Sequence, residues 1–426
     1  MGKLRYLIYG TIIVGIFLLI HLFFPREWSS WLLKTDELFQ GTRLQFLGLF
    51  IFGGFLFFIY PLLFGINFLA SFGKLNYPPG SENFTPPISV IIAAINEEKI
   101  IGNTLNSFVN STYPKDHLEL IIITSGSTDR TTEVCQEYQN KLNIKILTDP
   151  LPKGKPAALN HGLKHATHDI ICVYDADTQL YDNSLQNLVR HLSDPTIDAV
   201  SAPVVVRNWN ENKLTKGIAL EYTYLSGTGL YHEIRSRLGR NLWLMGRNYA
   251  IRKKILEEFG GWNENALTED LHLSAQLSAA KKKIRFAPDA KINERAPKTF
   301  KSFINQRKRW VGGYSQSLSE AMELDKRTVI LRNLAMMHFG HTLDLSFMAL
   351  IPAIIFGLIG DYYIMLLCIA TFIFGFGTYI NAVRKYGEGR YRLLLFFPIT
   401  IFIDWTMFSL QFKSYEELEW EKTIID

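Results

Sequence analysis

The chain has 426 residues, enough for about two or three domains with a sizeable core. An apolar fraction of 48% beside 45 basic and 40 acidic side chains is typical of membrane segments joined to one soluble domain. A net charge of +5 without a concentrated basic patch argues against nucleic acid as a partner, and three widely spaced cysteines argue against a disulfide framework or a zinc site.

Two uncharged runs, Tyr6–Phe24 and Leu44–Phe72, precede the polar part of the chain. Each is long enough to cross about 30 Å of hydrocarbon as a helix. No small-residue cleavage site follows the first run, so we expect an uncleaved anchor rather than a signal peptide. Lys3 and Arg5 place the N-terminus in the cytosol. Residues 1–74 are therefore predicted to hold two transmembrane helices that return the chain to the cytosol.

Residues 75–300 alternate short apolar strands with helices. We expect strands at Ile88–Ala93, Leu118–Thr124, Ile144–Leu147 and Asp169–Tyr174, and helices from Asn96 to about Asn110, over Arg130–Leu142 and over Lys155–His165. This alternation predicts a mostly parallel α/β sheet, whose ligands bind beyond the carboxyl ends of the strands. Neither a G-x-G-x-x-G fingerprint nor a phosphate-binding loop motif occurs, which leaves phosphate to a metal ion and side chains.

Asp175 and Asp177 close the apolar strand that ends at Tyr174. Carboxylates at i and i+2 project to one side of an extended chain, so both can reach one divalent cation. A lone pair of this kind is weak evidence, because many solvated strand ends carry it. Combined with the membrane-length runs, the pair suggests a nucleotide-diphosphate substrate used at the cytosolic face.

Three further features follow in a fixed order. Lys155 puts a cation on the loop before a helix. Thr268 is a natural N-cap, which leaves Asp270 in the first helical turn, where the helix dipole favours the ionised carboxylate that a general base needs. The run Gln306-Arg307-Lys308-Arg309-Trp310 offers an amide, a guanidinium and an indole. Each also has a structural alternative: Asp270 only completes a helix N-terminus, and 306–310 only contacts the membrane interface.

The ordered set Asp175-Ala-Asp177, Thr268-Glu-Asp270 and Gln306-x-x-Arg309-Trp310 resembles the membrane-embedded, inverting family-2 glycosyltransferases, which include hyaluronan, cellulose, chitin and poly-N-acetylglucosamine synthases. The resemblance covers the whole chain. It implies a GT-A α/β domain inserted between transmembrane helices. It also implies transfer of a sugar from a nucleotide-sugar with inversion.

The resemblance further implies a role for each residue of the set. Asp177, supported by Asp175, coordinates Mg²⁺ or Mn²⁺ on the nucleotide diphosphate, and Asp270 removes the proton of the acceptor hydroxyl. The remaining roles are donor binding by Asn96, Glu97, Ser125, Lys155 and Arg309, and acceptor binding by Gln306, Trp310, Glu269 and Gly246.

Departures from the family pattern cluster at the nucleotide. Ile95 stands where the family commonly has a tyrosine, and Ser125 stands where it has the aspartate that binds the base. We expect UDP as the donor nucleotide, with the Ser125 hydroxyl accepting the N–H of the base.

The trailing part begins with a predicted amphipathic interface helix in 301–332, with one face formed by Phe303, Trp310, Tyr314, Leu318 and Met322. Three transmembrane runs are expected in 333–412, at Asn333–Gly360, Tyr362–Val383 and Leu393–Phe412. The basic link 384–392 then lies in the cytosol and the acidic tail 413–426 outside. Asp344 and Asp404 either line a pore or pair near an interface, and the sequence does not decide between them.

The sequence therefore predicts a multi-pass protein of the cell membrane with a cytosolic catalytic domain. Its leading function is a processive β-glycosyltransferase that extrudes a polysaccharide. The alternative is a transferase that adds one sugar to a membrane lipid, and a nucleotide-sensing transporter or receptor is a third, non-enzymatic class. Expected partners are a nucleotide-sugar, a growing glycan or lipid acceptor, membrane lipids and a separate export or regulatory subunit.

Overall fold

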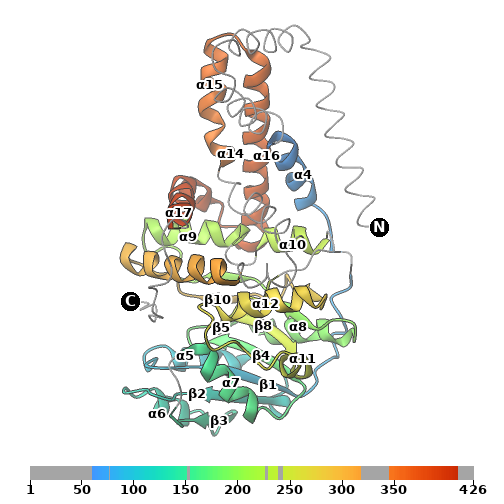
Figure 1. Ribbon diagram of the computed structural model, residues 1–426, viewed down its shortest axis with the longest axis vertical. Coiled ribbons are helices and arrows are strands. Elements are labelled where there is room, and N and C mark those ends of the chain that lie inside the picture. The colour runs from blue at the N-terminus through green and yellow to red at the C-terminus, as the bar shows by residue number, and fades with distance from the viewer. Residues whose placement is uncertain are drawn as a thin grey trace.

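The computed structural model describes residues 60–75, 77–150, 154–225, 229–237, 243–317 and 345–410. An α/β domain lies at one end of the long axis and a column of apolar helices at the other (Figure 1). The α/β domain confirms the predicted mostly parallel sheet with helices between its strands.

The main sheet has seven strands in the order β3-β2-β1-β4-β8-β6-β9. Their bounds are β1 Ile88–Ala93, β2 Leu118–Ile123, β3 Asn143–Leu147, β4 Ile170–Asp175, β6 Ala199–Ser201, β8 Asn248–Arg252 and β9 Ile284–Phe286. Strands β1 to β4 are parallel, whereas β8 is antiparallel to β4 and β6. A smaller sheet has the order β5-β10-β7, with β5 Gln179–Leu180, β7 Val204–Val206 and β10 Ile292–Glu294.

Apolar, mostly β-branched residues fill the central strands, and all six residues of β2 are buried, as expected for a parallel sheet covered on both faces. The helices of the domain are α5 Ile101–Asn110, α6 Thr131–Gln136, α7 Lys155–His165, α8 Ser184–Val189, α9 Lys213–Tyr224, α10 Leu230–Arg237, α11 Lys253–Glu258, α12 Glu269–Ala279 and the segment 300–317, with short 3-10 turns at Lys115–His117 and Arg190–Ser193.

Two helices are shorter than the sequence predicts. Helix α5 begins at Ile101 rather than at Asn96, because Asn96 adopts a left-handed φ of 55° and the N–H of Glu97 donates to the Thr131 hydroxyl at 2.7 Å. Helix α6 ends at Gln136, well before Leu142. Contacts between two loops that are distant in sequence therefore replace the first helical turn after β1.

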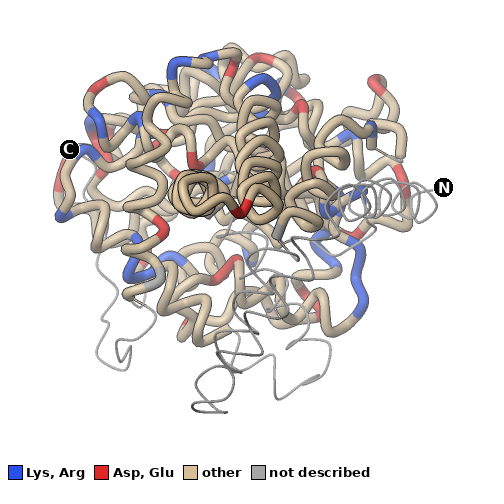
Figure 2. Tube along the Cα trace, turned by 90° about the horizontal axis from the view of Figure 1, so that it is seen from above, with Lys and Arg blue, Asp and Glu red and all other residues tan. Residues whose placement is uncertain are grey.

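The column consists of α4 Tyr60–Ser71, α14 Leu345–Met348, α15 Leu350–Leu358 and α16 Tyr362–Tyr386, and a 3-10 turn at Tyr391–Phe396 leads from it to α17 Phe397–Leu410. Helix α4 packs along α16, where the Asn381 amide donates to the Ser71 carbonyl at 2.7 Å. Seen from above, the charged residues lie mostly around the rim and the helices near the centre carry few (Figure 2).

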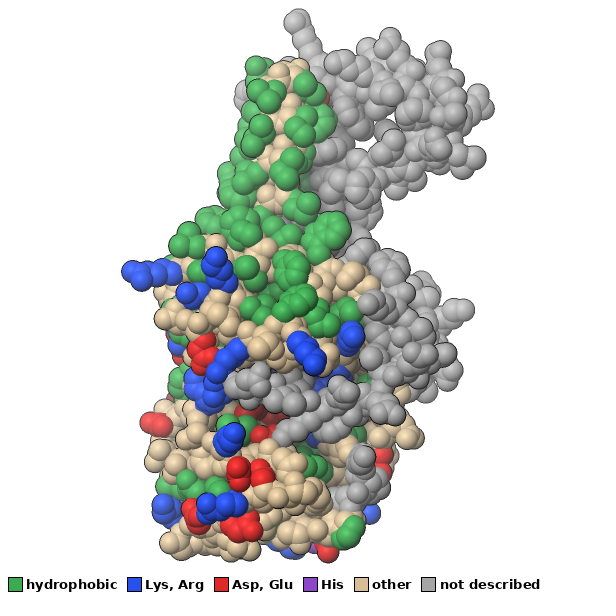
Figure 3. All heavy atoms as spheres, turned by 90° about the vertical axis from the view of Figure 1, so that its left-hand side faces the viewer, with side chains coloured by type: hydrophobic (Ala, Val, Ile, Leu, Met, Phe, Trp, Pro, Cys, Tyr) green, Lys and Arg blue, Asp and Glu red, His purple; other side chains and the backbone are tan. Residues whose placement is uncertain are grey.

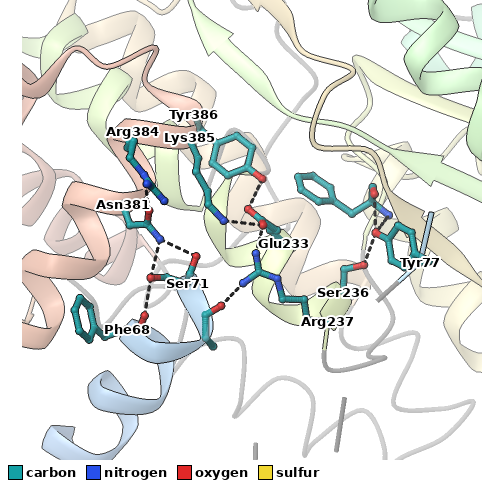
Figure 4. A network of polar contacts seen from close by, with 12 residues as sticks. Phe68, Ser71, Tyr77, Glu233, Ser236, Arg237, Asn381, Arg384, Lys385 and Tyr386 are labelled. Atoms are coloured by element: carbon teal, nitrogen blue, oxygen red, sulfur yellow. Dashed lines mark hydrogen bonds and ion pairs between the residues drawn. The ribbon is translucent and has the colours of Figure 1, made fainter. Parts of the chain in front are cut away.

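Glu233 of α10 attaches this column to the α/β domain (Figure 4). Its buried carboxylate accepts hydrogen bonds from Lys385 at 2.8 Å and from Tyr386 at 2.7 Å, both at the end of α16. It also pairs with Arg237, whose guanidinium donates to the Ala70 carbonyl of α4. We call Glu233, Arg237, Lys385 and Tyr386 the Glu233 hub.

Among the described residues, only α16 is long and apolar enough to cross a membrane, judged by length and composition. It contains the predicted run Tyr362–Val383. The runs Leu44–Phe72, Asn333–Gly360 and Leu393–Phe412 are described only in part, and Tyr6–Phe24, Asp344 and 413–426 lie outside the described residues. The multi-pass arrangement therefore stays a prediction.

One prediction for the interface helix is wrong. Phe303 was expected on a face that meets lipid, but its side chain is fully buried in the protein core. The apolar face of segment 300–317 is covered at this position by the α/β domain, and a helical period in the sequence cannot tell a protein neighbour from a lipid one. Leu318 and Met322 lie outside the described residues.

Candidate active site

The site lies where the carboxyl ends of β1, β2 and β4 meet. Ala93 is in register with Ile123 of β2 and with Asp175 of β4, so the loops that follow these strands begin at one edge of the sheet. The loop after β1 carries Asn96 and Glu97, and the loop after β4 carries Asp177. Parallel strands bind ligands at this edge.

Lys155 joins four segments at the centre of the site. Its ammonium nitrogen lies 2.5 Å from Asp175 Oδ1 and 3.0 Å from Glu269 Oε1, and it donates to the Gly246 carbonyl at 2.7 Å. These contacts use the three N–H donors of the ammonium group. Despite burial, Asp175 and Glu269 raise the pKa of Lys155, so the group stays charged. Lys155 therefore forms ion pairs with Asp175, which was predicted to bind the metal, and with Glu269, which was predicted to bind the acceptor.

Asp270 lies in the first turn of α12, as predicted, and backbone groups orient it. Its Oδ2 accepts from the Gly246 N–H at 2.6 Å and its Oδ1 from the Leu271 N–H at 2.8 Å. Burial, and secondarily repulsion from Glu269, raises the pKa of Asp270 to about 6. A carboxylate fixed by two backbone donors with this pKa suits a general base at neutral pH. Thr268 occupies the N-cap position but makes no side-chain capping bond.

Gly246 allows the approach of the two acidic side chains of α12. A Cβ at this position would lie 3.0 Å from Asp270 Oδ2 and 3.1 Å from Glu269 Oε1. The residue expected on the acceptor side thus donates its N–H to Asp270 and leaves room for both carboxylates because it has no side chain.

Asp177 is the strongest candidate for a metal ligand. Burial raises its pKa to about 8, and the neighbouring carboxylates of Glu294, Asp175 and Glu97 add to this rise. A divalent cation would relieve that repulsion, so the residues fit Mg²⁺ or Mn²⁺. The described residues contain no cluster of three or more potential metal ligands.

The residues predicted on the nucleotide side lie on two adjoining loops. Asn96 Oδ1 accepts from the Thr128 N–H at 2.8 Å, which ties the loop after β1 to the loop after β2. Ser125 is buried, and its hydroxyl donates weakly to the Leu147 carbonyl at 3.4 Å. The oxygen of that hydroxyl keeps its acceptor capacity.

The run 306–310 lies on helix 300–317, between the sheet and the column (Figure 1). Gln306 is buried, and within the described chain its Oε1 has no hydrogen-bond partner. Trp310 is half-buried, with the guanidinium groups of Arg307 and Arg247 lying 4.3 and 5.2 Å from its ring centroid. Arg309 is half-buried on the same helix. The indole is therefore a fixed platform rather than a mobile surface group.

Two buried ion pairs beside the site are not predicted by the sequence. Arg247 Nε lies 2.8 Å from Glu294 Oε2, and Arg307 Nη2 lies 2.5 Å from Glu221 Oε2. Tyr222 donates to Glu294 at 2.7 Å and completes this set. The signal that could find them is a lone acidic residue directly after an apolar run, as Glu221 is after Ile218-Ala219-Leu220 in α9.

Comparison with known proteins identifies several similar chains, three of which are described here. The chain is 35% identical over 60% of its length to a probable glycosyltransferase, YdaM, of Bacillus subtilis, and 32% identical over 57% to a beta-monoglucosyldiacylglycerol synthase of Nostoc. It is 29% identical over 53% to a poly-beta-1,6-N-acetyl-D-glucosamine synthase of Staphylococcus epidermidis. The chain spans 63%, 52% and 54% of the lengths of these three relatives.

Among solved structures, a mannosyltransferase of Pyrobaculum calidifontis in complex with GDP-Man and Mn²⁺ has a TM-score of 0.54 and 20% identity, covering 83% of this chain and 94% of that one. This likeness supports a GT-A-like fold. The family model described as "Glycosyltransferase like family 2" matches residues 86–313, more than half of the chain. The chain therefore belongs to glycosyltransferase family 2.

Proposed function

We propose that the chain is an inverting, metal-dependent hexosyltransferase with Asp270 as its general base. The observation that carries this proposal is the arrangement around Gly246. Its N–H fixes Asp270, and its carbonyl binds the same Lys155 that pairs with Asp175. The proposed base, directly, and the end of the strand that would hold the metal, through Lys155, are thus both tied to the backbone of Gly246. Such pre-organisation is what a single in-line displacement requires.

In the proposed reaction, Asp270 takes the proton of an acceptor hydroxyl. The oxygen attacks the anomeric carbon from the face opposite the diphosphate. The bond from that carbon to the phosphate oxygen breaks, its electron pair leaves with the nucleotide diphosphate, and an α-linked donor becomes a β-linked product. A bound Mg²⁺ or Mn²⁺, held by Asp177 and by Asp175 once it parts from Lys155, would neutralise the charge on the leaving group.

Lys155 and Arg309 are proposed to contact the diphosphate, with Asn96, Glu97 and Ser125 on the nucleotide. Lys155 has no N–H to spare in the present arrangement, so donor binding must release at least one of its three partners. Release of Asp175 would free that carboxylate for the cation. The donor nucleotide is proposed to be UDP.

The acceptor is proposed to be a growing glycan, which makes the enzyme a processive polysaccharide synthase that exports its product. An indole held in place by the guanidinium groups of Arg307 and Arg247 suits the C–H face of a sugar better than a glycerol backbone. The alternative is a lipid acceptor, which the likeness to a glucosyldiacylglycerol synthase favours. Gln306, Trp310, Glu269 and Gly246 would line the acceptor side in either case.

The test uses the full-length protein in lipid vesicles with radiolabelled UDP-, GDP- and dTDP-sugars, with and without Mn²⁺. We expect transfer from a UDP-sugar that requires the metal, is lost in Asp270→Asn and yields high-molecular-weight product. Organic-extractable product would instead establish the lipid acceptor. Transfer that survives metal chelation and Asp270→Asn would overturn the proposed mechanism.

A further inference from the structure

Helix α17 has two distinct faces. Thr400, Ile403, Met407 and Leu410 are buried and follow a helical period, whereas Phe402, Trp405 and Ser409 on the other side are exposed. Phe402 and Trp405 are 47% and 57% exposed, which leaves two large aromatic side chains without cover from the described chain. Within the described part of the chain, one face of α17 thus packs on the protein and the other presents exposed aromatic side chains.

The buried face binds α17 to the catalytic domain. A Cβ on Gly217 of α9 would lie 2.3 Å from Ile399, so the absence of a side chain there lets the two helices touch. Val311 of segment 300–317 forms a small apolar cluster with Met407 and Leu410. Helix α17 is therefore fixed to the two helices next to the site.

The direction of α17 does not fit a membrane crossing. The 25 residues of α16 extend about 37 Å and run along the long axis of the molecule, while α17 is strongly foreshortened in the same view (Figure 1). Because α17 packs chiefly on α9, it is attached to the α/β domain rather than to the column of helices.

The surface around α17 has the composition of a membrane interface. Apolar side chains cover the column and continue over its foot, and basic side chains begin just below them (Figure 3). Arg384 is exposed in the last turn of α16, and Arg392 and Leu395 are exposed in the 3-10 turn that precedes α17. Exposed Trp and Phe beside basic residues match the headgroup layer of an anionic bilayer.

We propose that α17 lies in the plane of the cytosolic membrane interface, with Phe402 and Trp405 inserted among the lipids, and does not cross the bilayer. This placement explains how Asp404, in the middle of the helix, can stay near water. It also holds α9 and helix 300–317 against the bilayer surface. The inference rests on the proposed membrane location and is independent of the proposed chemistry.

The test measures membrane depth at single spin-labelled cysteines, introduced as Phe402→Cys, Trp405→Cys and Ser409→Cys in the full-length protein in vesicles that contain anionic lipid. Cys135, Cys172 and Cys368 are buried and should not react. The matched control pair is Ile373→Cys and Ile380→Cys, exposed positions of α16 with the same seven-residue separation as 402 and 409. Retained thermal unfolding temperature shows that each variant is folded.

An in-plane α17 predicts the same shallow depth at 402, 405 and 409, while 373 and 380 differ by about 10 Å along the spanning α16. A difference of about 10 Å between 402 and 409 would overturn the proposal and restore α17 as a span. Labels at 402, 405 and 409 that all remain in bulk water would overturn it as well. Labels at 373 and 380 outside lipid would instead contradict the membrane location itself.

Discussion

The candidate active site and the Glu233 hub both bury charge, but they balance it in opposite ways. In the hub, three donors converge on one carboxylate. In the site, Asp175 and Glu269 share the ammonium group of Lys155, while the pKa values of Asp177 and Asp270 are raised to about 8 and about 6. The hub surrounds one carboxylate with donors, whereas the site holds carboxylates whose ionisation the metal-free fold disfavours. This difference is what we expect between a cluster that stabilises the fold and a site that binds a cation and a substrate.

The largest expected effect is on turnover at the site. Asp270→Asn should lower kcat by about 100- to 10,000-fold, because the amide cannot take the proton from the hydroxyl group of the acceptor. Nucleotide binding, measured by calorimetry, should be retained. The control is Glu258→Gln, a half-exposed surface carboxylate paired with Lys282. A wild-type kcat in Asp270→Asn would remove the base from the mechanism.

The hub should show the largest effect on folding. Glu233→Ala removes the anion that the buried Arg237 and the half-buried Lys385 share, so the free energy of unfolding should fall by about 3–5 kcal/mol. Glu258→Ala breaks an exposed pair and should cost at most about 1 kcal/mol. Chemical unfolding in detergent micelles measures both. Equal losses in the two variants would mean that the hub does not join column and domain.

Asp177→Asn should act on folding in the opposite direction. Because the folded-state pKa of this acid is raised to about 8, the metal-free protein loses stability as pH rises from about 4 to about 8. Removing the carboxylate should therefore stabilise metal-free protein at pH 8 by about 0.5–2 kcal/mol while abolishing activity. The gain should vanish near pH 4. A lower free energy of unfolding for metal-free Asp177→Asn at pH 8 would contradict the difference drawn between the site and the hub.

The smallest expected effect is the slope of the pH–rate profile. Asp270 must be ionised to act, so kcat should fall about tenfold per pH unit below about 6 and stay level above it. In energy this is about 1.4 kcal/mol per unit. Rates at saturating donor between pH 4.5 and 8 provide the measurement. A level profile down to pH 4.5 would place the base elsewhere.

Local patterns predict much of this fold from the sequence. The bounds of β1 and α7 match their predictions because each contains its own signal, an apolar β-branched run and a helix opened by Gly-Lys-Pro. The late start of α5 depends on Thr131, over thirty residues away. The direction of α17 depends on Gly217, almost two hundred residues away. Such distant contacts leave no periodic trace in the sequence.

The sequence also predicts the candidate site only in part. Its acidic residues and Lys155 are predicted from motif order, and the structure brings them together. The ion pairs among them are not predicted. The sequence does not say which carboxylates Lys155 will contact, and only the folded geometry selects Asp175 and Glu269. The ion pairs of Arg247 and Arg307 are missed for the same reason.

Gly246 also limits how this enzyme can be redesigned. Any side chain there would press on Asp270 and Glu269, so a library that varies the loop to admit new acceptors must keep this position as glycine. Useful diversity should instead come from residues whose side chains point away from the two carboxylates. Loop shuffling from relatives will succeed only where the incoming segment carries glycine at the matching point.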